Sequence, residues 1–260
     1  MQILHYTKAR SLDEAWDLNQ QRGTVILGGC CWLRLSPQRI IREAVDLSDL
    51  GLHSIEEREK DFRLGAMVTL RQLEQSEALA AYTQGAMKEC VRHIVGTQFR
   101  NLATLGGSIA GRFGFSDIWT LFLALRAQVV LYKGGTVSLA EFSKTGAGKD
   151  IVTHVIIPKT ATQAVYDSLR LNATDFPIIA CAMASYDDGI DAVVGAKPSR
   201  AEEIHLDWTT LESMTADAVA EACSTPWKYE TNMRGSATYR QAMAKVLCRR
   251  LWERVKGEQA

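Results

Sequence analysis

Two glycine pairs carry the clearest chemical signal in this sequence. Gly28-Gly29 follows the β-branched run 24–27, and Gly106-Gly107 stands between Thr104 and Ser108. Glycine allows a backbone to approach a ligand closely and consecutive N–H groups to point toward an anion, so both segments suit a nucleotide diphosphate. A lone glycine pair more often makes only a tight turn. Because there are two pairs, each flanked by Thr or Ser, nucleotide binding and a purely structural role are equally well supported.

Other signatures of catalysis and metal binding are missing from the sequence. No GxxxxGK[ST] motif is present, which argues against phosphoryl transfer, and no GxGxxG motif marks an ordinary dinucleotide site. The six cysteines include no CxxC pair and the five histidines share no spacing, so the chain encodes neither a zinc site nor an iron–sulfur cluster locally. We expect the cysteines to be mostly small buried hydrophobic side chains.

The composition limits the classes of partner. Hydrophobic residues make up 47% of the 260 residues, and 30 Lys+Arg balance 30 Asp+Glu, which is typical of a globular protein and argues against a nucleic-acid partner. The longest apolar stretch, 118–125, is far shorter than the roughly 20 residues that a bilayer requires. The N-terminus lacks the pattern of a signal peptide, so we expect a cytoplasmic protein with no membrane span.

The residues around the first glycine pair predict a β-α-β unit. Strands are expected at 2–7 and 24–27, with a helix at about 11–22 between them, because Ser11 and Glu14 form a capping box. The first glycine pair then lies at the end of a strand, where α/β folds bind ligands. Two further strands are expected, at 40–47 and 62–67.

The second glycine pair is expected in a loop system. Small and polar residues dominate 96–111, which predicts a loop interrupted by short extended pieces. Before it, the apolar spacing predicts a helix across about 77–94, with Gly85 as its weakest point. After it, Ser116-Asp117 is expected to cap a buried helix at 118–126.

The rest of the chain predicts antiparallel sheet followed by helix. Gly134-Gly135 marks one hairpin turn and Asp188-Gly189 marks another. From about 209 the pattern is helical, and this order favours an α+β C-terminal domain that begins near 160. The expected strands are 127–132, 136–139, 151–157 and about 163–171, 178–186 and 190–195.

The segment around the second pair, GTQFRNLATLGGSIA at 96–110, resembles the FAD-binding subunit of molybdenum hydroxylases, the family of xanthine dehydrogenase and carbon monoxide dehydrogenase medium subunits. LGG at 27–29 precedes it, and Ser116-Asp117 with an apolar LxLAL helix follows. The similarity continues through Leu169-Arg170 and Asp175 to RGSAxYR at 234–240. It therefore covers nearly the whole chain, in the order that the family has.

The resemblance implies an α+β fold with two domains. Residues 1–159 would form a two-subdomain FAD-binding domain of the vanillyl-alcohol-oxidase type, with subdomains at about 1–55 and 56–159. Residues 160–260 would form the family's C-terminal domain, an antiparallel sheet with helices.

The resemblance also implies the contacts to FAD. By position, 25–32 would wrap the diphosphate and 104–108 would form a second wall. One departure stands at Cys30-Cys31-Trp32, where relatives have Thr or Ser and then a polar residue: a hydroxyl donor is lost there while backbone donors remain. The residues assigned to FAD are Val25, Ile26, Leu27, Gly28, Gly29, Cys30, Cys31, Trp32, Ile94, Thr104, Leu105, Gly106, Gly107, Ser108, Asp117, Val152 and Arg170.

Such a subunit transfers electrons and needs no catalytic side chain of its own. The resemblance implies an iron–sulfur subunit and a molybdopterin-binding subunit as partners, with electrons passing from the iron–sulfur clusters through FAD to NAD+ or another acceptor. Xanthine or another N-heterocycle would be the substrate hydroxylated by the partner. Two alternatives stay open: a non-catalytic scaffold subunit whose flavin site has decayed, and a free-standing flavin oxidoreductase.

Overall fold

The computed structural model describes residues 1–35 and 40–257. The chain folds into two compact units, each built from several segments. The first unit comprises Met1–Gln72, Thr97–Gly111 and Gln128–Ile157, and the second comprises Leu73–Gly96, Arg112–Ala127 and Pro158–Ala260.

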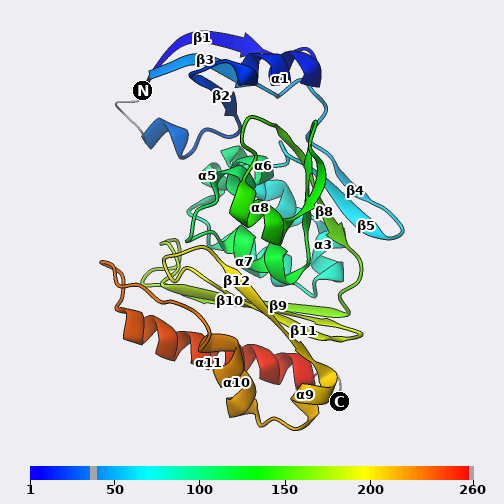
Figure 1. The fold of residues 1–260 in the computed structure, drawn as a ribbon, viewed down its shortest axis with the longest axis vertical. Coiled ribbons are helices and arrows are strands. Elements are labelled where there is room, and N and C mark those ends of the chain that lie inside the picture. Colours follow the sequence, from blue (N-terminus) through cyan, green and yellow to red (C-terminus); the bar gives the residue numbers. More distant parts are fainter. Residues whose placement is uncertain (36–39, 258–260) are drawn as a thin grey trace. The chain divides into compact units, whose positions relative to one another are not determined.

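A small parallel sheet opens the first unit (Figure 1). Its strands run in the order β1-β3-β2, and α1 packs against it through a cluster that includes Ala15, Ile26 and Val45. Ser11 caps α1 by accepting a hydrogen bond from the N–H of Glu14, so the expected β-α-β unit is confirmed. The elements are β1 (Gln2–Lys8), α1 (Leu12–Gln20), β2 (Thr24–Leu27), the 3₁₀ turn η1 (Leu33–Leu35) and β3 (Ile40–Asp46).

A five-stranded sheet forms the rest of the first unit's framework, in the order β4-β5-β8-β6-β7. The expected hairpin at Gly134-Gly135 is confirmed, because β6 and β7 pair antiparallel across it and Gly135 takes a φ of 72°. The short edge strand β4 was not predicted. The elements are β4 (Ile55–Glu57), β5 (Asp61–Gly65), β6 (Gln128–Leu131), β7 (Gly135–Ser138), α8 (Leu139–Thr145) and β8 (Val152–Pro158), and α2 (Leu70–Gln75) follows β5.

The expectation of a loop at 96–111 is wrong. The segment forms two helices, α5 (Thr97–Leu102) and α6 (Leu105–Gly111). Glycine disfavours helix, but Leu105 and Ile109 are fully buried, and their packing outweighs the weak propensity of the segment.

The prediction of a single helix at 77–94 is also wrong. Two helices occupy this part of the second unit, α3 (Glu77–Tyr82) and α4 (Ala86–Arg92). They separate at Gly85, whose φ of 87° lies in the left-handed region that ends a helix.

A four-stranded antiparallel sheet, in the order β12-β11-β10-β9, forms the centre of the second unit (Figure 1). Its two middle strands are buried along their whole length, because α10 and α11 cover one face while α7 packs on the other. The expected turn at Asp188-Gly189 is confirmed, whereas β12 was not predicted. The elements are α7 (Asp117–Ala124), β9 (Gln163–Leu169), β10 (Ile179–Tyr186), β11 (Gly189–Gly195), β12 (Glu202–Asp207), α9 (Trp208–Glu212), α10 (Ala216–Ser224) and α11 (Ala237–Gly257).

The cysteines behave as expected. All six are free thiols, and all except Cys30 are buried. Among the residues that the structure describes, no group of three His, Cys, Asp or Glu side chains is arranged to hold a metal ion. No helix in the described ranges is long and apolar enough to span a membrane.

Candidate cofactor site

The loop that follows β2 turns sharply at Cys30. This residue has a φ of 57°, in the left-handed region that favours glycine, whereas Gly28 and Gly29 do not take positive φ values. The thiols of Cys30 and Cys31 turn back onto the loop, with Sγ 3.3 Å from the carbonyl oxygen of Gly28 and 3.4 Å from that of Gly29, respectively. The two glycines are therefore needed for a reason other than backbone conformation.

That reason is the close approach of the two glycine segments within the first unit. A Cβ on Gly29 would lie 1.7 Å from the carbonyl oxygen of Leu102, and a Cβ on Gly28 would lie 2.6 Å from Oγ1 of Thr104. It would also lie 3.5 Å from Cα of Gly107. The structure thus brings together the two segments that the sequence separates by more than seventy positions.

The two glycines of the second pair have different roles. A Cβ on buried Gly106 would lie 2.7 Å from Cβ of Ala66 and 2.8 Å from its carbonyl oxygen, so this glycine is required for packing. Gly107 is exposed, and its Cβ would meet only Oγ1 of Thr104, at 3.0 Å. Gly106 therefore anchors α6, while Gly107 faces away from the core.

Backbone donors differ between the two segments. The N–H groups of Leu105 and Gly106 donate to the carbonyl oxygens of Val68 and Ala66, at 2.8 and 2.7 Å. The N–H of Gly107 donates to Oγ1 of Thr104, at 3.2 Å. In contrast, the N–H groups of 28–30 donate to no acceptor among the described residues. This first loop therefore offers consecutive backbone donors of the kind that hold an anion such as a diphosphate.

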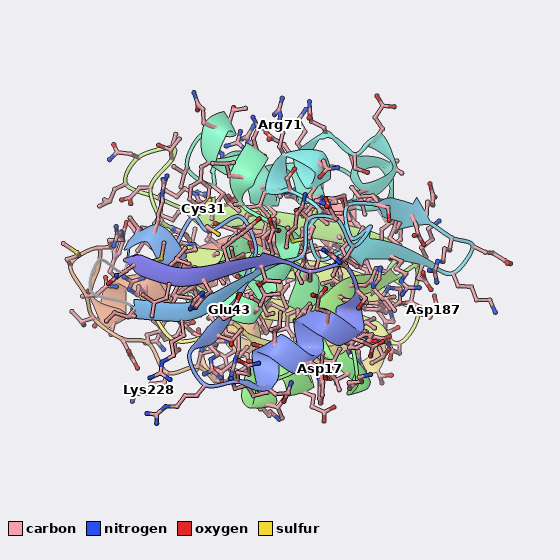
Figure 2. All side chains as sticks on the ribbon, turned by 90° about the horizontal axis from the view of Figure 1, so that it is seen from above. Asp17, Cys31, Glu43, Arg71, Asp187 and Lys228 are labelled. Carbon is pink, nitrogen blue, oxygen red and sulfur yellow. The ribbon has the colours of Figure 1, made fainter. Side chains whose placement is uncertain are left out.

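The side chains beside these donors are weak hydrogen-bonding groups. Burial raises the pKa of the Cys30 thiol, and the nearby carboxylate of Asp46 raises it further. Burial likewise raises the pKa of the Cys31 thiol (Figure 2 labels this residue). Both thiols are neutral at pH 7, and Trp32 packs edge-on against Phe99 with ring centroids 6.4 Å apart. The strongest donors that the loop offers are therefore its backbone N–H groups.

A second group of predicted residues meets in the second unit. Asp117, the first residue of α7, accepts hydrogen bonds on Oδ1 from the Arg170 guanidinium and from the hydroxyl of Tyr166. Arg170 also donates to the carbonyl oxygen of Asp175, at 2.6 Å. Asp117 and Arg170 were predicted from the sequence, whereas Tyr166 was not. Tyr166 and Arg170 are four residues apart along an extended segment, which places them on one face, and this spacing was the available signal.

The Asp117 carboxylate is nearly sealed from solvent. The side chains of Asp117 and Arg170 are 5% and 6% exposed. Burial raises the pKa of the Asp117 carboxyl, and the charge of Arg170 and the hydroxyl of Tyr166 oppose that rise. The ion pair therefore keeps a charge inside the protein at the start of a helix, where the helix dipole also favours an anion.

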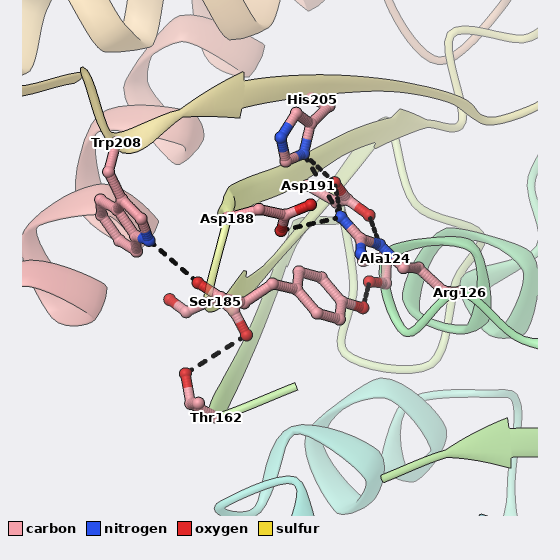
Figure 3. A network of polar contacts seen from close by, with 9 residues as sticks. Ala124, Arg126, Thr162, Ser185, Asp188, Asp191, His205 and Trp208 are labelled. Atoms are coloured by element: carbon pink, nitrogen blue, oxygen red, sulfur yellow. Dashed lines mark hydrogen bonds and ion pairs between the residues drawn. The ribbon is translucent and has the colours of Figure 1, made fainter. Parts of the chain in front are cut away.

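The other end of α7 is fixed by a separate polar network, shown in Figure 3. Arg126 donates to both carboxylate oxygens of Asp191, at 2.6 and 3.1 Å, and stacks on Tyr186 with its guanidinium carbon 3.7 Å from the ring centroid. The hydroxyl of Tyr186 donates to the carbonyl oxygen of Ala124, at 2.6 Å, and His205 lies 2.7 Å from Asp191. Both ends of α7 are therefore attached to the same sheet.

The remaining predicted residues lie in ordinary structural positions. Val25, Ile26 and Leu27 form β2, and Val152 begins β8, both in the first unit. Ser108 of α6 donates its hydroxyl to the carbonyl oxygen of Thr104, the residue before this helix. Ile94 follows α4 in the second unit and is partly buried.

Comparison with known proteins identifies relatives over the whole chain. The family described as the FAD binding domain in molybdopterin dehydrogenase matches residues 2–160. The nicotine 6-hydroxylase medium subunit of Paenarthrobacter nicotinovorans is 27% identical, over 95% of each chain. The carbon monoxide dehydrogenase medium chain of Afipia carboxidovorans is 30% identical, over 82% of this chain and 81% of the relative.

Solved structures share the fold. A chain of quinoline 2-oxidoreductase from Pseudomonas putida 86 superposes with a TM-score of 0.84 at 21% identity, covering 99% of this chain and 97% of that one. A chain of reconstituted CO dehydrogenase from Oligotropha carboxidovorans gives a TM-score of 0.85 at 23% identity, covering 99% and 98%. The mixed helix and sheet architecture is therefore that of these chains.

Proposed function

Because the chain belongs to the family of FAD-binding domains in molybdopterin dehydrogenases, we propose that it is the electron-transfer subunit of a molybdenum-containing hydroxylase, with FAD as its cofactor. The observation that carries the proposal is the meeting of the two glycine segments beside the backbone donors of 28–30. Consecutive N–H groups next to an exposed glycine suit a dinucleotide diphosphate. The residues present therefore fit FAD.

Within this proposal the chain binds and orients FAD. When bound, FAD supplies the electron-transfer chemistry. The backbone of 28–30 would hold the diphosphate, and Thr104 and Gly107 would form the opposite wall. Asp117, Arg170, Ile94 and Val152 remain assigned to FAD by the family resemblance.

The domain organisation is also a proposal. The three sheets follow one another along the sequence, at 2–46, 55–158 and 163–207. This order supports subdomains at about 1–55 and 56–159 in a domain of the vanillyl-alcohol-oxidase type, and a C-terminal domain at 160–260.

The reaction is proposed from the relatives. Nicotine 6-hydroxylase and carbon monoxide dehydrogenase contribute a medium subunit and a medium chain, which implies larger partner chains. In this proposal a molybdopterin subunit binds the substrate, and an iron–sulfur subunit passes electrons to FAD. More specifically, we propose an N-heterocycle such as xanthine as the substrate and NAD+ as the electron acceptor.

The identity of the cofactor is the first test. The purified chain should show the visible bands of oxidised flavin, and heat should release FAD that chromatography distinguishes from FMN. FAD is expected because a site with two glycine segments suits a diphosphate better than a single phosphate. A colourless protein that binds no added FAD supports the scaffold alternative, and recovery of FMN contradicts the proposed site.

Partners are the second test. The six cysteines of these 260 residues are free thiols and form no iron–sulfur site, so within this proposal the electrons come from an iron–sulfur centre outside them. Purification from the native host should recover an iron–sulfur protein and a large molybdenum protein with it, detected by mass spectrometry and metal analysis. Full NADH-oxidising turnover by the chain alone, without associated iron, would instead establish a free-standing flavin oxidoreductase.

A further inference from the structure

A carboxylate lies next to the donor loop 28–30 of the first unit, at the end of the central strand of its parallel sheet. β1, β3 and β2 run parallel, so their carboxyl ends lie at one edge, where Asp46 of β3 pairs with Lys8 of β1 and with Leu27 of β2. Leu27 leads directly into the loop. Burial raises the pKa of the Cys30 thiol and the charge of Asp46 raises it further, which places this carboxylate beside the loop.

The Asp46 carboxylate is ionised and can accept further hydrogen bonds. Its Oδ2 accepts from the hydroxyl of Tyr6, at 2.6 Å, and its Oδ1 accepts from the N–H of Ser48, at 2.8 Å. Burial raises the pKa of the Asp46 carboxyl, but these hydrogen bonds outweigh burial and hold that pKa below its ordinary value. An ionised carboxylate accepts about four hydrogen bonds, and Asp46 is only partly buried, so a ligand at the loop can donate to it.

The donors that suit this position are the hydroxyl groups of a sugar. A carboxylate repels a diphosphate, because both are negatively charged, so Asp46 does not serve the diphosphate itself. In FAD the adenosine ribose is joined directly to the diphosphate and carries two neighbouring hydroxyl groups. In parallel sheets that bind dinucleotides, an acidic residue about 20 residues after the glycine turn accepts a ribose hydroxyl, and Asp46 follows Gly28 at about that spacing.

We propose that Asp46 binds the adenosine ribose of the cofactor by accepting hydrogen bonds from its hydroxyl groups, while Tyr6 and Ser48 hold the carboxylate in place. The inference rests on the proposed function, because it requires the diphosphate of FAD at the loop 28–30. It explains why an acidic side chain lies at the edge of the sheet where an anion binds.

The test compares Asp46→Asn with Asp49→Asn. Both variants remove one negative charge near the end of β3, and Asp49 is an exposed residue that pairs with Lys8 at 2.7 Å. Two ligands are titrated into the full chain depleted of FAD and followed by flavin fluorescence. One is FAD, and the other is the FAD analogue that contains 2′,3′-dideoxyadenosine and therefore lacks both ribose hydroxyl groups. The wild-type chain should bind FAD about tenfold more tightly than the analogue, as expected for hydrogen bonds to a charged acceptor.

The two variants should differ in this preference. Asp46→Asn should bind FAD about tenfold more weakly than wild type, and its affinities for the two ligands should lie within about twofold of each other. Asp49→Asn should keep the tenfold preference. The direction is decisive, because removing a negative charge near a diphosphate would by itself tighten the binding of both ligands. The carboxamide oxygen of Asn can still accept from Ser48, so the turn should persist, as circular dichroism can check.

Failure of the inference and failure of the proposed function give different results. If the wild-type chain binds neither ligand, the proposed function fails. If it binds both equally well, or if Asp46→Asn keeps the preference or weakens both ligands equally, the ribose assignment is overturned while the function stands. If Asp46→Asn does not fold, Asp46→Glu takes its place. This variant keeps the charge but moves the carboxylate by one methylene group, so the preference should fall below about threefold, and an unchanged preference overturns the assignment.

Discussion

Gly107→Val is expected to abolish FAD retention while the chain still folds. Gly107 is exposed, and a Cβ there would meet only Oγ1 of Thr104, at 3.0 Å, so a shift of this hydroxyl by a few tenths of an ångström is all that the Cβ requires of the fold. Its Cα lies 3.5 Å from the position that a Cβ on Gly28 would take, so the valine stands where the two glycine segments meet. A branched side chain there would block the approach of the diphosphate. The loss should be at least roughly 100-fold in affinity.

The matched variant is Gly106→Val, one residue earlier. Here the Cβ would lie 2.8 Å from the carbonyl oxygen of Ala66 on a buried backbone, so the expected result is misfolding. Circular dichroism and thermal unfolding measure the fold, and the flavin absorbance of the purified chain measures retention. Wild-type FAD occupancy in Gly107→Val would show that the second segment does not face the cofactor. Equal misfolding of both variants would show that Gly107 is also structural.

Local signals predicted the elements that depend on neighbouring residues. The cap of α1 by Ser11 and the turns at Gly134-Gly135 and Asp188-Gly189 are set by side chains and glycines within a few positions, and the structure confirms them. Gly85 was predicted as the weakest point of one helix but not as the place where the helix ends. A glycine can persist within a helix or end it, and the packing around it decides.

Elements that depend on distant contacts were not predicted. The segment 96–111 is rich in glycine and polar residues, yet it forms α5 and α6, because backbone bonds to 66–68 and buried side chains support it. Likewise, β12 pairs with β11 at the edge of the second unit's sheet, and its alternating burial gives a weaker signal than a buried strand.

The structure brings together the two glycine segments that the sequence analysis grouped, but the contacts that their residues make were not predicted. The glycine spacing indicated that both segments bind one ligand, and the structure brings them together. It did not indicate that the N–H groups of Leu105 and Gly106 donate to the carbonyl oxygens of Val68 and Ala66. The backbone donors that remain for a ligand are therefore those of 28–30. Nor did it indicate that Cys30 rather than a glycine takes the positive φ, because backbone angles in a loop depend on what packs against it.

A large loss of stability is expected for Arg170→Met. The substitution leaves the Asp117 carboxylate buried without its cationic partner, which typically costs about 3–5 kcal/mol. The measurement is urea unfolding of the FAD-free chain at pH 7. Arg126→Met is the control at the other end of α7. It should cost less, because the Arg126 side chain is 38% exposed and His205 still faces Asp191 after the change.

The loss in Arg170→Met should depend on pH with a definite sign. Burial already raises the pKa of Asp117, and removing the positive charge raises it further. An acid whose pKa is higher in the folded state than in the unfolded state binds more protons when folded, so the free energy of unfolding rises as the pH falls through that range. The deficit relative to wild type should therefore be largest at pH 7 and shrink on acidification, by up to about 1.4 kcal/mol per pH unit. The double variant Asp117→Asn with Arg170→Met removes the buried charge and should recover much of the loss. A deficit that is independent of pH, or no recovery in the double variant, would mean that Arg170 stabilises the second unit by packing rather than by pairing with Asp117.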